Sequence, residues 1–390
     1  MIPYGKHFLD ETDIAAVTDV LRGSFLTQGP KIADFEAAIA SYVGARFAVA
    51  VSSGTAGLHL ACLAADVGAG DIVATSPITF VASANCALYV GARPVFVDVD
   101  PVTLNLSAES LKEIGQQESK IKVVIPVHYA GLPCDMAAIH SVAETWGAVI
   151  IEDAAHALGA SYPDGGKVGN CASSLMTVFS FHPVKAIAAG EGGLITTNDE
   201  VIYKRLLRLR SHGINKGDDP MLNPEAAQEN GEPNLWYYEM QELGLNYRIT
   251  DIQSALALSQ LGKLDKFISR RRDIVLSYDR ALTGIAALKP AQSEGRNRSA
   301  HHLYPVRIDF AQIGMRRSQF MRRLRERGIG TQVHYIPVYL HPYYSSLGYQ
   351  PESCPAAEAY YNEALSLPLY FKLTDSEQEE VVGALEELLQ

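Results

Sequence analysis

The 390-residue sequence lacks most features of secreted, membrane-bound or nucleic-acid-binding proteins. Cysteine is rare, and the five residues are widely scattered without a Cys-x-x-Cys pair: Cys62, Cys86, Cys134, Cys171 and Cys354. This pattern indicates neither a disulfide framework nor a thiolate zinc site, and we predict no metal. No stretch is apolar for long enough to span a bilayer, and the amino-terminal residues contain no apolar secretion signal. We therefore expect a protein of the reducing cytoplasm.

Positive charge is also scarce. The 33 Lys and Arg residues are outnumbered by 44 Asp and Glu residues, which gives a net charge of -11, and no block is rich in Lys or Arg. This balance argues against a nucleic-acid or membrane partner. What the sequence has is 47% hydrophobic and 20% charged residues, as a globular protein does. Its length suffices for one large core and a second, smaller domain.

Short apolar runs rich in β-branched residues recur through the first half of the chain, at residues 47–51, 72–74, 94–97, 123–125 and 148–151. Continuous apolar runs of this length predict strands buried on both faces. The segments between them, such as 107–114 and 136–146, are long enough for crossover helices, so we predict a mainly parallel sheet covered by helices. Residues 177–180 and 194–197 are joined by a glycine-rich loop without a helix, which predicts one antiparallel strand.

The pattern changes after about residue 248, and we predict two domains, residues 1–248 with an N-terminal arm and residues 249–390. Apolar residues at spacings of three and four from Ile252 to Leu282 predict one long amphipathic helix. Beyond it we predict strands at 302–308 and 330–335, a helix around 320–324, and a final helix that starts with a capping box at Thr374–Glu377. These elements make a smaller α+β domain.

Residues 215–235 are rich in Asn, Gly, Pro and acidic side chains. They predict a long loop, which in a compact domain is more often functional or disordered than structural.

Lys185 is the first candidate for chemistry. It follows the strand-like run 177–180 and stands before Gly190, Gly192 and Gly193. A lysine in a partly desolvated loop is suited to forming a Schiff base, because that reaction needs the neutral amine. A lone lysine is usually just exposed. Asp153, which ends another strand-like run, favours the Schiff-base lysine over the exposed one. Together the two residues look like the lysine and the acid that handle pyridoxal phosphate.

Asp153 closes the apolar run 148–151, where a buried carboxylate is costly unless it is paired. The protonated nitrogen of a pyridine ring is such a partner, and pairing keeps the ring a good electron sink. The alternative is an aspartate that caps the next helix. His156, three residues on, is expected on the same helical face, where it reaches the cofactor or orients Asp153. A structural histidine is the alternative.

Ser53, Gly54 and Thr55 follow the first strand and open a helix, so free backbone N–H groups there suit a phosphate. A plain helix cap is the alternative, since the same residues cap helices. Ser180 is expected to give its hydroxyl to the same phosphate, unless it is an ordinary strand-end serine. Phe80 is a candidate to stack on the ring, with a core phenylalanine as the alternative.

These motifs together resemble the sugar aminotransferases of the DegT/DnrJ/EryC1/StrS family. The match includes Ser-Gly-Thr-Ala (53–56), Thr-Phe-Val-Ala-Ser-Ala-Asn (79–85), Glu-Asp-Ala-Ala-His-Ala-Leu-Gly (152–159), Ser-Phe-His-Pro-Val-Lys (180–185), Glu-Gly-Gly (191–193) and Gly-Leu-Asn-Tyr-Arg (244–248). The motifs occur in order along nearly the whole chain. The resemblance implies an α/β fold-type I pyridoxal-phosphate enzyme, similar in architecture to aspartate aminotransferase. It also implies a homodimer with active sites at the subunit interface, where Asn246 reaches the phosphate from the neighbouring subunit, although Asn246 alone fits a turn equally.

Within the family the similarity points to the pseudaminic-acid branch, the UDP-4-amino-4,6-dideoxy-N-acetyl-β-L-altrosamine transaminases. The cues are residues 211–214, 251–261, 302–305 and 332–339. This branch implies the UDP-sugar UDP-2-acetamido-2,6-dideoxy-β-L-arabino-hex-4-ulose as substrate, with L-glutamate as donor. The matching substrate contacts are Tyr4, Ser24, Phe25, Leu26, Thr27, His334 and Tyr335. A packing role for Tyr4 and a plain loop at 24–27 are the alternatives.

Other functions remain open from the sequence. Another aminotransferase branch, acting on UDP-4-keto-arabinose or on a dTDP- or GDP-4-keto sugar, differs only in the pocket. A sugar 3-dehydratase of this fold has a histidine in place of the lysine, so Lys185 argues against it. A non-catalytic nucleotide-sugar-binding or regulatory module is disfavoured because Asp153, Ser180 and Lys185 are all present. A simple nucleotide-binding protein lacks a Gly-x-Gly-x-x-Gly or Walker pattern here.

Overall fold

A seven-stranded sheet forms the centre of the computed structural model, which describes residues 1–118, 120–217 and 219–389. The strand order is β1-β7-β6-β5-β4-β2-β3. The strands are β1 (Phe47–Val51), β2 (Ile72–Thr75), β3 (Arg93–Phe96), β4 (Ile121–Ile125), β5 (Val149–Asp153), β6 (Met176–Ser180) and β7 (Gly193–Thr197). Each of the seven predicted runs is confirmed as a strand, and nearly every strand residue is buried.

Strand direction decides where the polar ends of the strands meet. Neighbouring strands from β6 through β5, β4 and β2 to β3 are parallel, whereas β7 is antiparallel to both β6 and β1. The predicted antiparallel strand is therefore confirmed. Because β1, β5 and β6 run in the same direction, their carboxyl ends lie at one edge of the sheet, with Ser53, Asp153 and Ser180 at or just after those ends.

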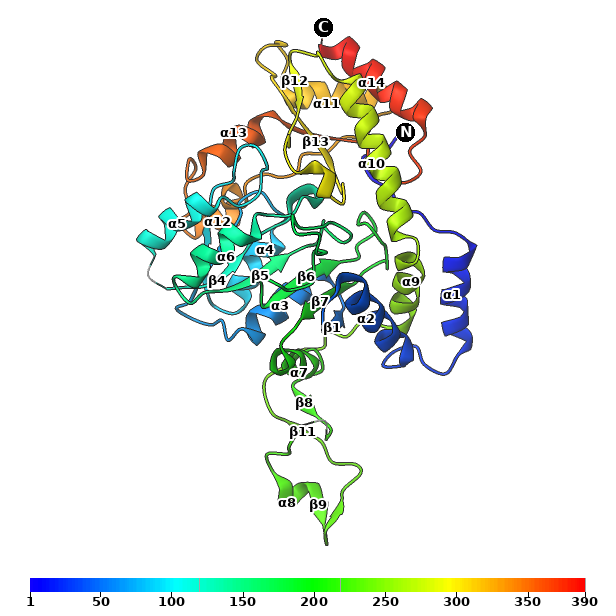
Figure 1. Cartoon of the computed structure of the whole chain (residues 1–390), viewed down its shortest axis with the longest axis vertical. Helices are drawn as coiled ribbons and strands as arrows, with labels where there is room; N and C mark the ends of the chain where they lie inside the picture. Colours follow the sequence, from blue (N-terminus) through cyan, green and yellow to red (C-terminus); the bar gives the residue numbers. More distant parts are fainter. Residues whose placement is uncertain (119, 218, 390) are drawn as a thin grey trace.

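Helices cover both faces of this sheet (Figure 1). One face is covered by α2 (Pro30–Val43), α5 (Ala108–Gln117), α6 (Met136–Glu144) and α9 (Asp251–Leu261), and the other by α3 (Gly54–Ala64), α4 (Ala82–Tyr89) and α7 (Glu200–Leu209). Alternate residues of β1 serve the two cores, with Ala48 and Ala50 on the first side and Val49 and Val51 on the second. This is the arrangement that continuous apolar strands require.

The prediction of one long helix from Ile252 to Leu282 is wrong. The helix α9 ends at Leu261 and a separate helix, α10 (Leu264–Ala281), begins after Gly262 and Lys263. Between the two helices, Lys263 forms ion pairs with two carboxylates at the start of α1 (Glu11–Arg22). Its Nζ lies 2.5 Å from Asp10 Oδ1 and 2.8 Å from Asp13 Oδ2. The apolar periodicity continues through the break because both helices stay buried. The helix α9 and the first turns of α10, with Leu264 and Ile268, pack on the core of the large sheet, and the rest of α10, from Ile274, packs on a second core.

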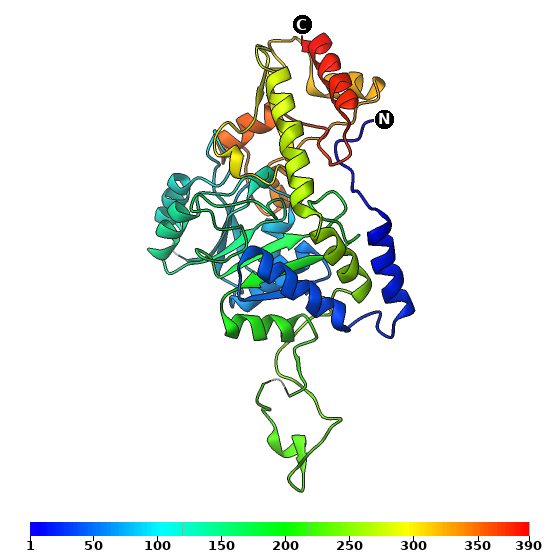
Figure 2. The same cartoon turned by 45° about the vertical axis from the view of Figure 1, so that its right-hand side comes forward.

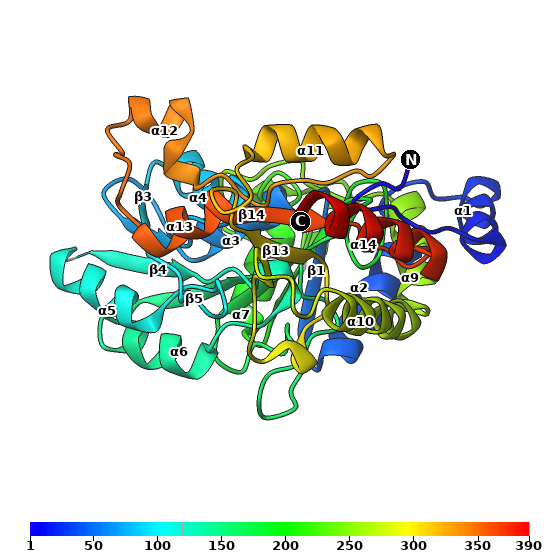
Figure 3. The same cartoon turned by 90° about the horizontal axis from the view of Figure 1, so that it is seen from above.

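The second core lies over a three-stranded antiparallel sheet of order β12-β13-β14, formed by β12 (Leu288–Pro290), β13 (Tyr304–Ile308) and β14 (Ala364–Leu367). It packs with α10, α11 (Arg317–Glu326) and α14 (Asp375–Leu389), which lie together in Figure 3. The predicted final helix is confirmed together with its capping box, in which the Glu377 N–H donates to Thr374 Oγ1 at 3.1 Å. Ile2 also belongs to this core.

The predicted strand at 330–335 is wrong. In that segment only Gln332 pairs as an isolated bridge, with Ser366, and the third strand of the small sheet is β14 instead. The segment departs from strand geometry because its side chains turn to the cavity described below, where Gln332, His334 and Tyr335 form part of the wall.

The predicted loop at 215–235 forms an arm that projects from the body of the molecule (Figures 1 and 2). It carries the short helix α8 (Pro224–Ala227) and two small strand pairs, β8 (Ile214–Asn215) with β11 (Glu239–Met240) and β9 (Gln228–Glu229) with β10 (Glu232–Pro233). Among the helices of the described ranges, none combines the length and apolar character that a membrane crossing requires.

Candidate functional site

A cavity of about 810 Å³ lies at the edge of the sheet where β1, β5 and β6 end. It gathers residues from distant parts of the chain, including the start of α3, the ends of β5 and β6, the glycine-rich loop and the segment before β14. The predicted site residues on its wall are Tyr4, Ser53, Gly54, Thr55, Phe80, Asp153, His156, Ser180, Lys185, His334 and Tyr335. A volume of this size suits a cofactor together with a small-molecule substrate.

Lys185 is presented by a loop that closes on itself. The N–H of Phe181 donates to the carbonyl of Gly192 at 2.9 Å, and the N–H of Lys185 donates to the carbonyl of His182 at 2.8 Å. Burial lowers the pKa of the Lys185 amine from 10.5 to about 8, against the opposing pull of the Asp153 carboxylate. Near neutral pH a useful fraction of the amine is therefore unprotonated, as a nucleophile and proton carrier needs.

The start of α3 forms an anion cradle. The N–H groups of Gly54 and Thr55 have no hydrogen-bond acceptor among the described residues, and they point from the positive end of the helix. The hydroxyl of Ser180, which lies beside them, has no partner there either. The Ser53 side chain caps the helix by accepting from Ala56 N at 3.1 Å, so the cap alternative holds for its hydroxyl.

Two glycines make this cradle possible. A Cβ at Gly54 would lie 2.9 Å from the Cβ of Ser180, and a Cβ at Gly193 would lie 2.3 Å from the carbonyl oxygen of Ser53. Only glycine permits the helix start, the end of β6 and the start of β7 to approach this closely. The cradle therefore has the free donors and the space that a phosphate group needs.

Asp153 ends β5 and is 6% exposed. Its carboxylate accepts from the Ala155 N–H at 3.0 Å and from Ser83 Oγ at 2.6 Å. In the described part of the chain no Lys, Arg or His lies within ion-pair distance of it. The alternative of a helix cap is wrong, because a turn follows β5. A buried carboxylate with hydrogen-bond capacity to spare on the cavity wall fits a cationic ring nitrogen.

The expected position of His156 on a helical face shared with Asp153 is wrong, because residues 155–159 form a turn. His156 instead places its Nε2 3.2 Å from the hydroxyl of Tyr335, and its ring lies 4.3 Å from the ring of His302. Burial holds the pKa of His156 well below its usual value, and the nearby Lys185 adds to this effect. The ring is therefore neutral at the cavity wall.

Phe80 is 59% exposed, so the alternative of a core phenylalanine is wrong. Its ring stands at the mouth of the cavity beside Val81 and Ala82. An aromatic face at that place is available to stack on a planar ring.

The opposite wall is formed by Tyr4 and by residues 332–336. The rings of Tyr4 and His334 lie 5.5 Å apart, and His334 Nδ1 lies 2.8 Å from Ser366 Oγ. The carbonyl of His334 accepts from the hydroxyls of Tyr129 at 2.8 Å and Tyr360 at 2.9 Å. Burial, assisted by Lys185, lowers the pKa of His334 to about 4, so its imidazole is neutral. This wall is thus held rigidly and carries hydrogen-bonding groups without charge.

Two groups of predicted residues lie outside the cavity. Ser24, Phe25, Leu26 and Thr27 are exposed, and Thr27 forms a bridge with Thr250. Asn246 is also exposed and pairs with Ser211 through the backbone. Their predicted roles in substrate and phosphate binding stay predictions.

The cavity also contains residues that the sequence did not single out as site residues, among them His302, His182 and Gln332. Burial, together with His156 and Lys185, holds the pKa of His302 well below its usual value. His302 stands in a motif used to recognise the family branch, but no spacing in the sequence connects it with His156. Only the packing of the small sheet against the turn after β5 brings these two rings together.

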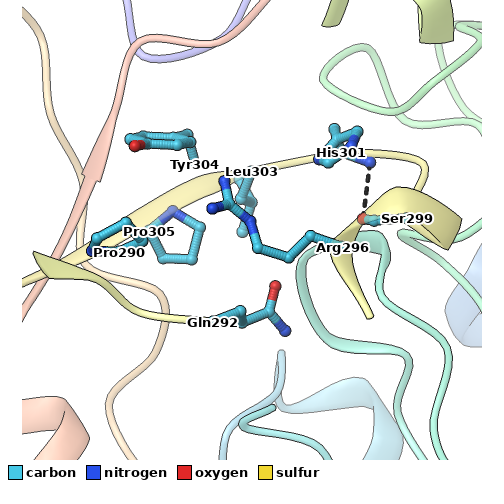
Figure 4. A pocket seen from close by; sticks show the side chains of 8 residues that line it. All are labelled: Pro290, Gln292, Arg296, Ser299, His301, Leu303, Tyr304 and Pro305. Atoms are coloured by element: carbon cyan, nitrogen blue, oxygen red, sulfur yellow. Dashed lines mark hydrogen bonds between the residues drawn. The ribbon is translucent and has the colours of Figure 1, made fainter. Parts of the chain in front are cut away.

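A second hollow lies away from this cavity and is small. The hollow in Figure 4, which is lined by Gln292, Arg296, Ser299 and His301 among others, has a volume of about 10 Å³, enough for a water molecule. Arg296 is paired there with Asp279 at 3.0 Å. Across the described ranges no group of three or more His, Cys, Asp or Glu side chains is arranged to hold a metal ion.

Comparison with known proteins relates this geometry to one family. Residues 7–386 match the family model of the DegT/DnrJ/EryC1/StrS aminotransferases. The spore coat polysaccharide biosynthesis protein SpsC of Bacillus subtilis (strain 168) is 38% identical over 392 residues, which cover 100% of this chain and 97% of SpsC.

Two solved structures have the same fold with a TM-score of 0.88. One is Helicobacter pylori PseC, an aminotransferase involved in the biosynthesis of pseudoaminic acid, at 29% identity, with 100% of this chain and 99% of PseC covered. The other is the putative sugar aminotransferase Spr1654 from Streptococcus pneumoniae in its PMP form, at 30% identity, with 100% and 99% covered.

Proposed function

Because the chain belongs to the DegT/DnrJ/EryC1/StrS aminotransferase family, we propose that it aminates C4 of a UDP-linked 4-keto-6-deoxy-N-acetylhexosamine with L-glutamate as donor. The specific substrate that we propose is UDP-2-acetamido-2,6-dideoxy-β-L-arabino-hex-4-ulose, in pseudaminic acid biosynthesis. Enzymes of this family depend on pyridoxal 5′-phosphate, and so does this chain. The observation that carries the proposal is a desolvated lysine amine that shares one cavity with a buried carboxylate and an anion cradle.

The residues of the cavity fit this cofactor group by group. The free N–H groups of Gly54 and Thr55, with the Ser180 hydroxyl, would hold its phosphate. Asp153 would pair with its ring nitrogen and Phe80 would cover one ring face, with His156 at the ring edge. When bound, the cofactor supplies an electron sink that makes the Cα–H bond of an attached amine acidic.

Lys185 has two tasks in this proposal. Its neutral amine would hold the cofactor covalently until an amine substrate takes its place. The free Nζ would then act as general base and general acid, removing the proton at Cα of glutamate and supplying the proton at C4 of the ketosugar. One amine with a pKa of about 8 can both accept and release that proton. The buried Asp153 carboxylate would face the ring nitrogen from the cavity wall.

We place the nucleotide sugar against the wall formed by Tyr4, His334 and Tyr335. The neutral state of His334 supports this, since a neutral imidazole can both donate to and accept from sugar hydroxyl and amide groups. Residues 24–27 and Asn246 would reach a site only from a second chain. The structural likeness to PseC supports the pseudaminic-acid substrate.

A homodimer is part of the proposal. The arm and the segment after it expose large apolar side chains, with Leu235 98%, Trp236 74%, Leu222 75% and Leu243 81% exposed. Apolar side chains concentrated on one projecting segment favour burial against a partner. Asn246 follows this segment directly, so a partner that receives the arm would bring Asn246 toward its own cavity.

The test is a single turnover of the purified protein in its pyridoxamine-phosphate form with a panel of nucleotide 4-ketosugars, with the C4 configuration of the product read by NMR. We expect conversion of the UDP-linked N-acetylhexosamine ketone and loss of turnover in Lys185→Ala and Lys185→Arg. Conversion of UDP-4-keto-arabinose alone, or of a dTDP- or GDP-linked ketone alone, would overturn the proposed substrate. The assignment as a transaminase would still stand. Full turnover by Lys185→Ala would overturn the mechanism.

A further inference from the structure

Two buried hydroxyl groups stand behind the Asp153 carboxylate. Ser83, on α4, is fully buried and places its Oγ 2.6 Å from Asp153 Oδ2. Thr79, 3% exposed in the loop before α4, places its Oγ1 2.7 Å from Ser83 Oγ. Thr79 and Asp153 both line the cavity, and Ser83 lies between them, behind the wall.

The direction of these hydrogen bonds follows from proton counting. An ionised carboxylate only accepts hydrogen bonds, so the single proton of Ser83 must point to Asp153. Thr79 must then donate to Ser83, and this is the only hydrogen bond of the Thr79 hydroxyl among the described residues. The contact of 2.6 Å is short, as expected when a hydroxyl donates to a charged oxygen. The Ala155 N–H supplies a second donor at 3.0 Å to the other oxygen.

The two donors fix the plane of the Asp153 carboxylate, while lone pairs remain for a partner on the cavity side. The contacts also join Asp153 to the segment that carries Phe80, because the Ser83 N–H donates to the Phe80 carbonyl at 3.3 Å.

We propose that Ser83, supported by Thr79, is a positioning residue that holds the Asp153 carboxylate in place toward the ring nitrogen of the cofactor. The inference rests on the role proposed for Asp153 and is independent of which sugar is the substrate. Ser83 touches neither cofactor nor substrate in this role. Its effect reaches the chemistry through Asp153, since the ring remains a good electron sink only while its nitrogen is protonated.

The test uses the holoenzyme with cofactor labelled with ¹⁵N at the ring nitrogen, whose chemical shift reports protonation at each pH. In the wild type we expect a protonated nitrogen throughout the pH range in which the protein is folded. In Ser83→Ala the nitrogen should lose its proton within that range, and the dissociation constant of the cofactor should rise by about tenfold, because a hydrogen bond to a charged group is lost. Ser83→Thr should restore both.

A matched control separates positioning from a general loss of stability. Thr75 is also fully buried and donates to the carbonyl of Ile125 at 2.9 Å, without contact to Asp153. The Thr75→Val protein should be less stable than the wild type, but its ring nitrogen should titrate as in the wild type. Thr79→Val should shift the titration of the ring nitrogen in the same direction as Ser83→Ala, by a smaller amount. If the Ser83→Ala protein does not fold, Thr79→Val provides the test.

An unchanged titration in the folded Ser83→Ala and Thr79→Val proteins would overturn the proposal, as would an equal shift in Thr75→Val. None of these readouts requires the sugar to turn over. Failure of the substrate assignment would therefore leave them unaffected, and their failure would leave the substrate assignment standing.

Discussion

A Cβ at position 193 would lie 2.3 Å from the carbonyl oxygen of Ser53, closer than any real side-chain contact. Gly193 begins β7 and Ser53 caps α3, so this pair sets how closely the antiparallel strand and the helix start approach each other. The distance explains why glycine stands at the end of the lysine loop. The glycine is required by a neighbour far away in the sequence, since its own φ is not in the left-handed region.

Gly193→Ala should displace the start of α3 and open the anion cradle. We expect the dissociation constant for pyridoxal phosphate to rise by about tenfold or more, because the backbone donors lose their alignment. Equilibrium titration of the cofactor-free protein measures this. Gly68→Ala is the control, since a Cβ there meets nothing within 4 Å, and an equal loss of affinity in both variants would contradict the role of Gly193.

The lowered pKa of Lys185 predicts how capture of the cofactor depends on pH. The rate at which the cofactor-free protein forms its bond to pyridoxal phosphate should rise with pH as Lys185 loses its proton, and level off above about pH 8. Stopped-flow absorbance measures this rate. A rate that keeps rising toward pH 10.5, the ordinary value for lysine, would show that the amine is not desolvated.

The buried Lys185 amine should also destabilise the cofactor-free protein. Its pKa is lower in the folded state than in the unfolded state, so between about pH 8 and 10.5 the unfolded chain binds more protons and stability rises with pH. The penalty is fully present below pH 8. Lys185→Met should therefore raise the free energy of unfolding at neutral pH by up to about 3 kcal/mol.

Urea unfolding at several pH values tests this prediction, and the gain should shrink as the pH approaches 10.5. The exposed Lys112→Met is the control and should change little. A gain that is independent of pH would indicate better packing of methionine in place of relief from a buried charge.

Glu152, the neighbour of Asp153 on β5, should be essential for stability. Its buried carboxylate accepts from His128 Nε2 at 2.7 Å, from Thr177 Oγ1 at 2.9 Å and from the hydroxyls of Tyr162 and Ser174. Burial alone would raise the pKa of Glu152, but the hydrogen bonds led by that from His128 hold it below its usual value. Glu152→Gln leaves donors facing an amide N–H₂ and should cost about 2–5 kcal/mol.

The loss of unfolding free energy in Glu152→Gln should be largest above pH 4.5, the ordinary pKa of glutamate. It should become smaller as the pH falls through the lowered pKa of Glu152. Urea unfolding near neutral and acid pH measures it. Glu200→Gln, which removes one side of an exposed pair with Lys204, should stay within about 0.5 kcal/mol. A difference that grows in acid would have the wrong sign for this account.

The arm provides a test of the proposed dimer. The double substitution Leu235→Ser with Trp236→Ser should shift the protein toward a monomer in sedimentation velocity, because it removes two large exposed apolar side chains of the arm. Cofactor affinity should fall with dissociation if a partner completes the site. Tyr343→Ser, on α12 (Pro342–Ser346) and also exposed, should leave the sedimentation unchanged. A dimer that persists in the double variant would remove the arm from the interface.

Strand prediction succeeded in the large sheet because each run is buried on both faces and therefore apolar throughout, as at Ala48 to Val51. It failed at 330–335. The local sequence pattern there resembles that of a strand, but the segment lines the cavity and pairs only through the isolated bridge at Gln332. The division of the helix near Gly262 was also missed, because both helices stay buried and the apolar periodicity therefore continues across the break.

The sequence by itself determined the chemistry-bearing residues that share a short motif, such as Ser180 with Lys185, because local spacing and strand ends fix where they lie. It also determined the parallel sheet whose common edge collects Ser53, Asp153 and Ser180. Only the tertiary structure decided that His156 turns to Tyr335 and His302, that Ser83 stands behind Asp153, and that Gly193 must lie against Ser53. These contacts join residues far apart in the chain, and no local pattern encodes a distance that is set by the packing of separate elements.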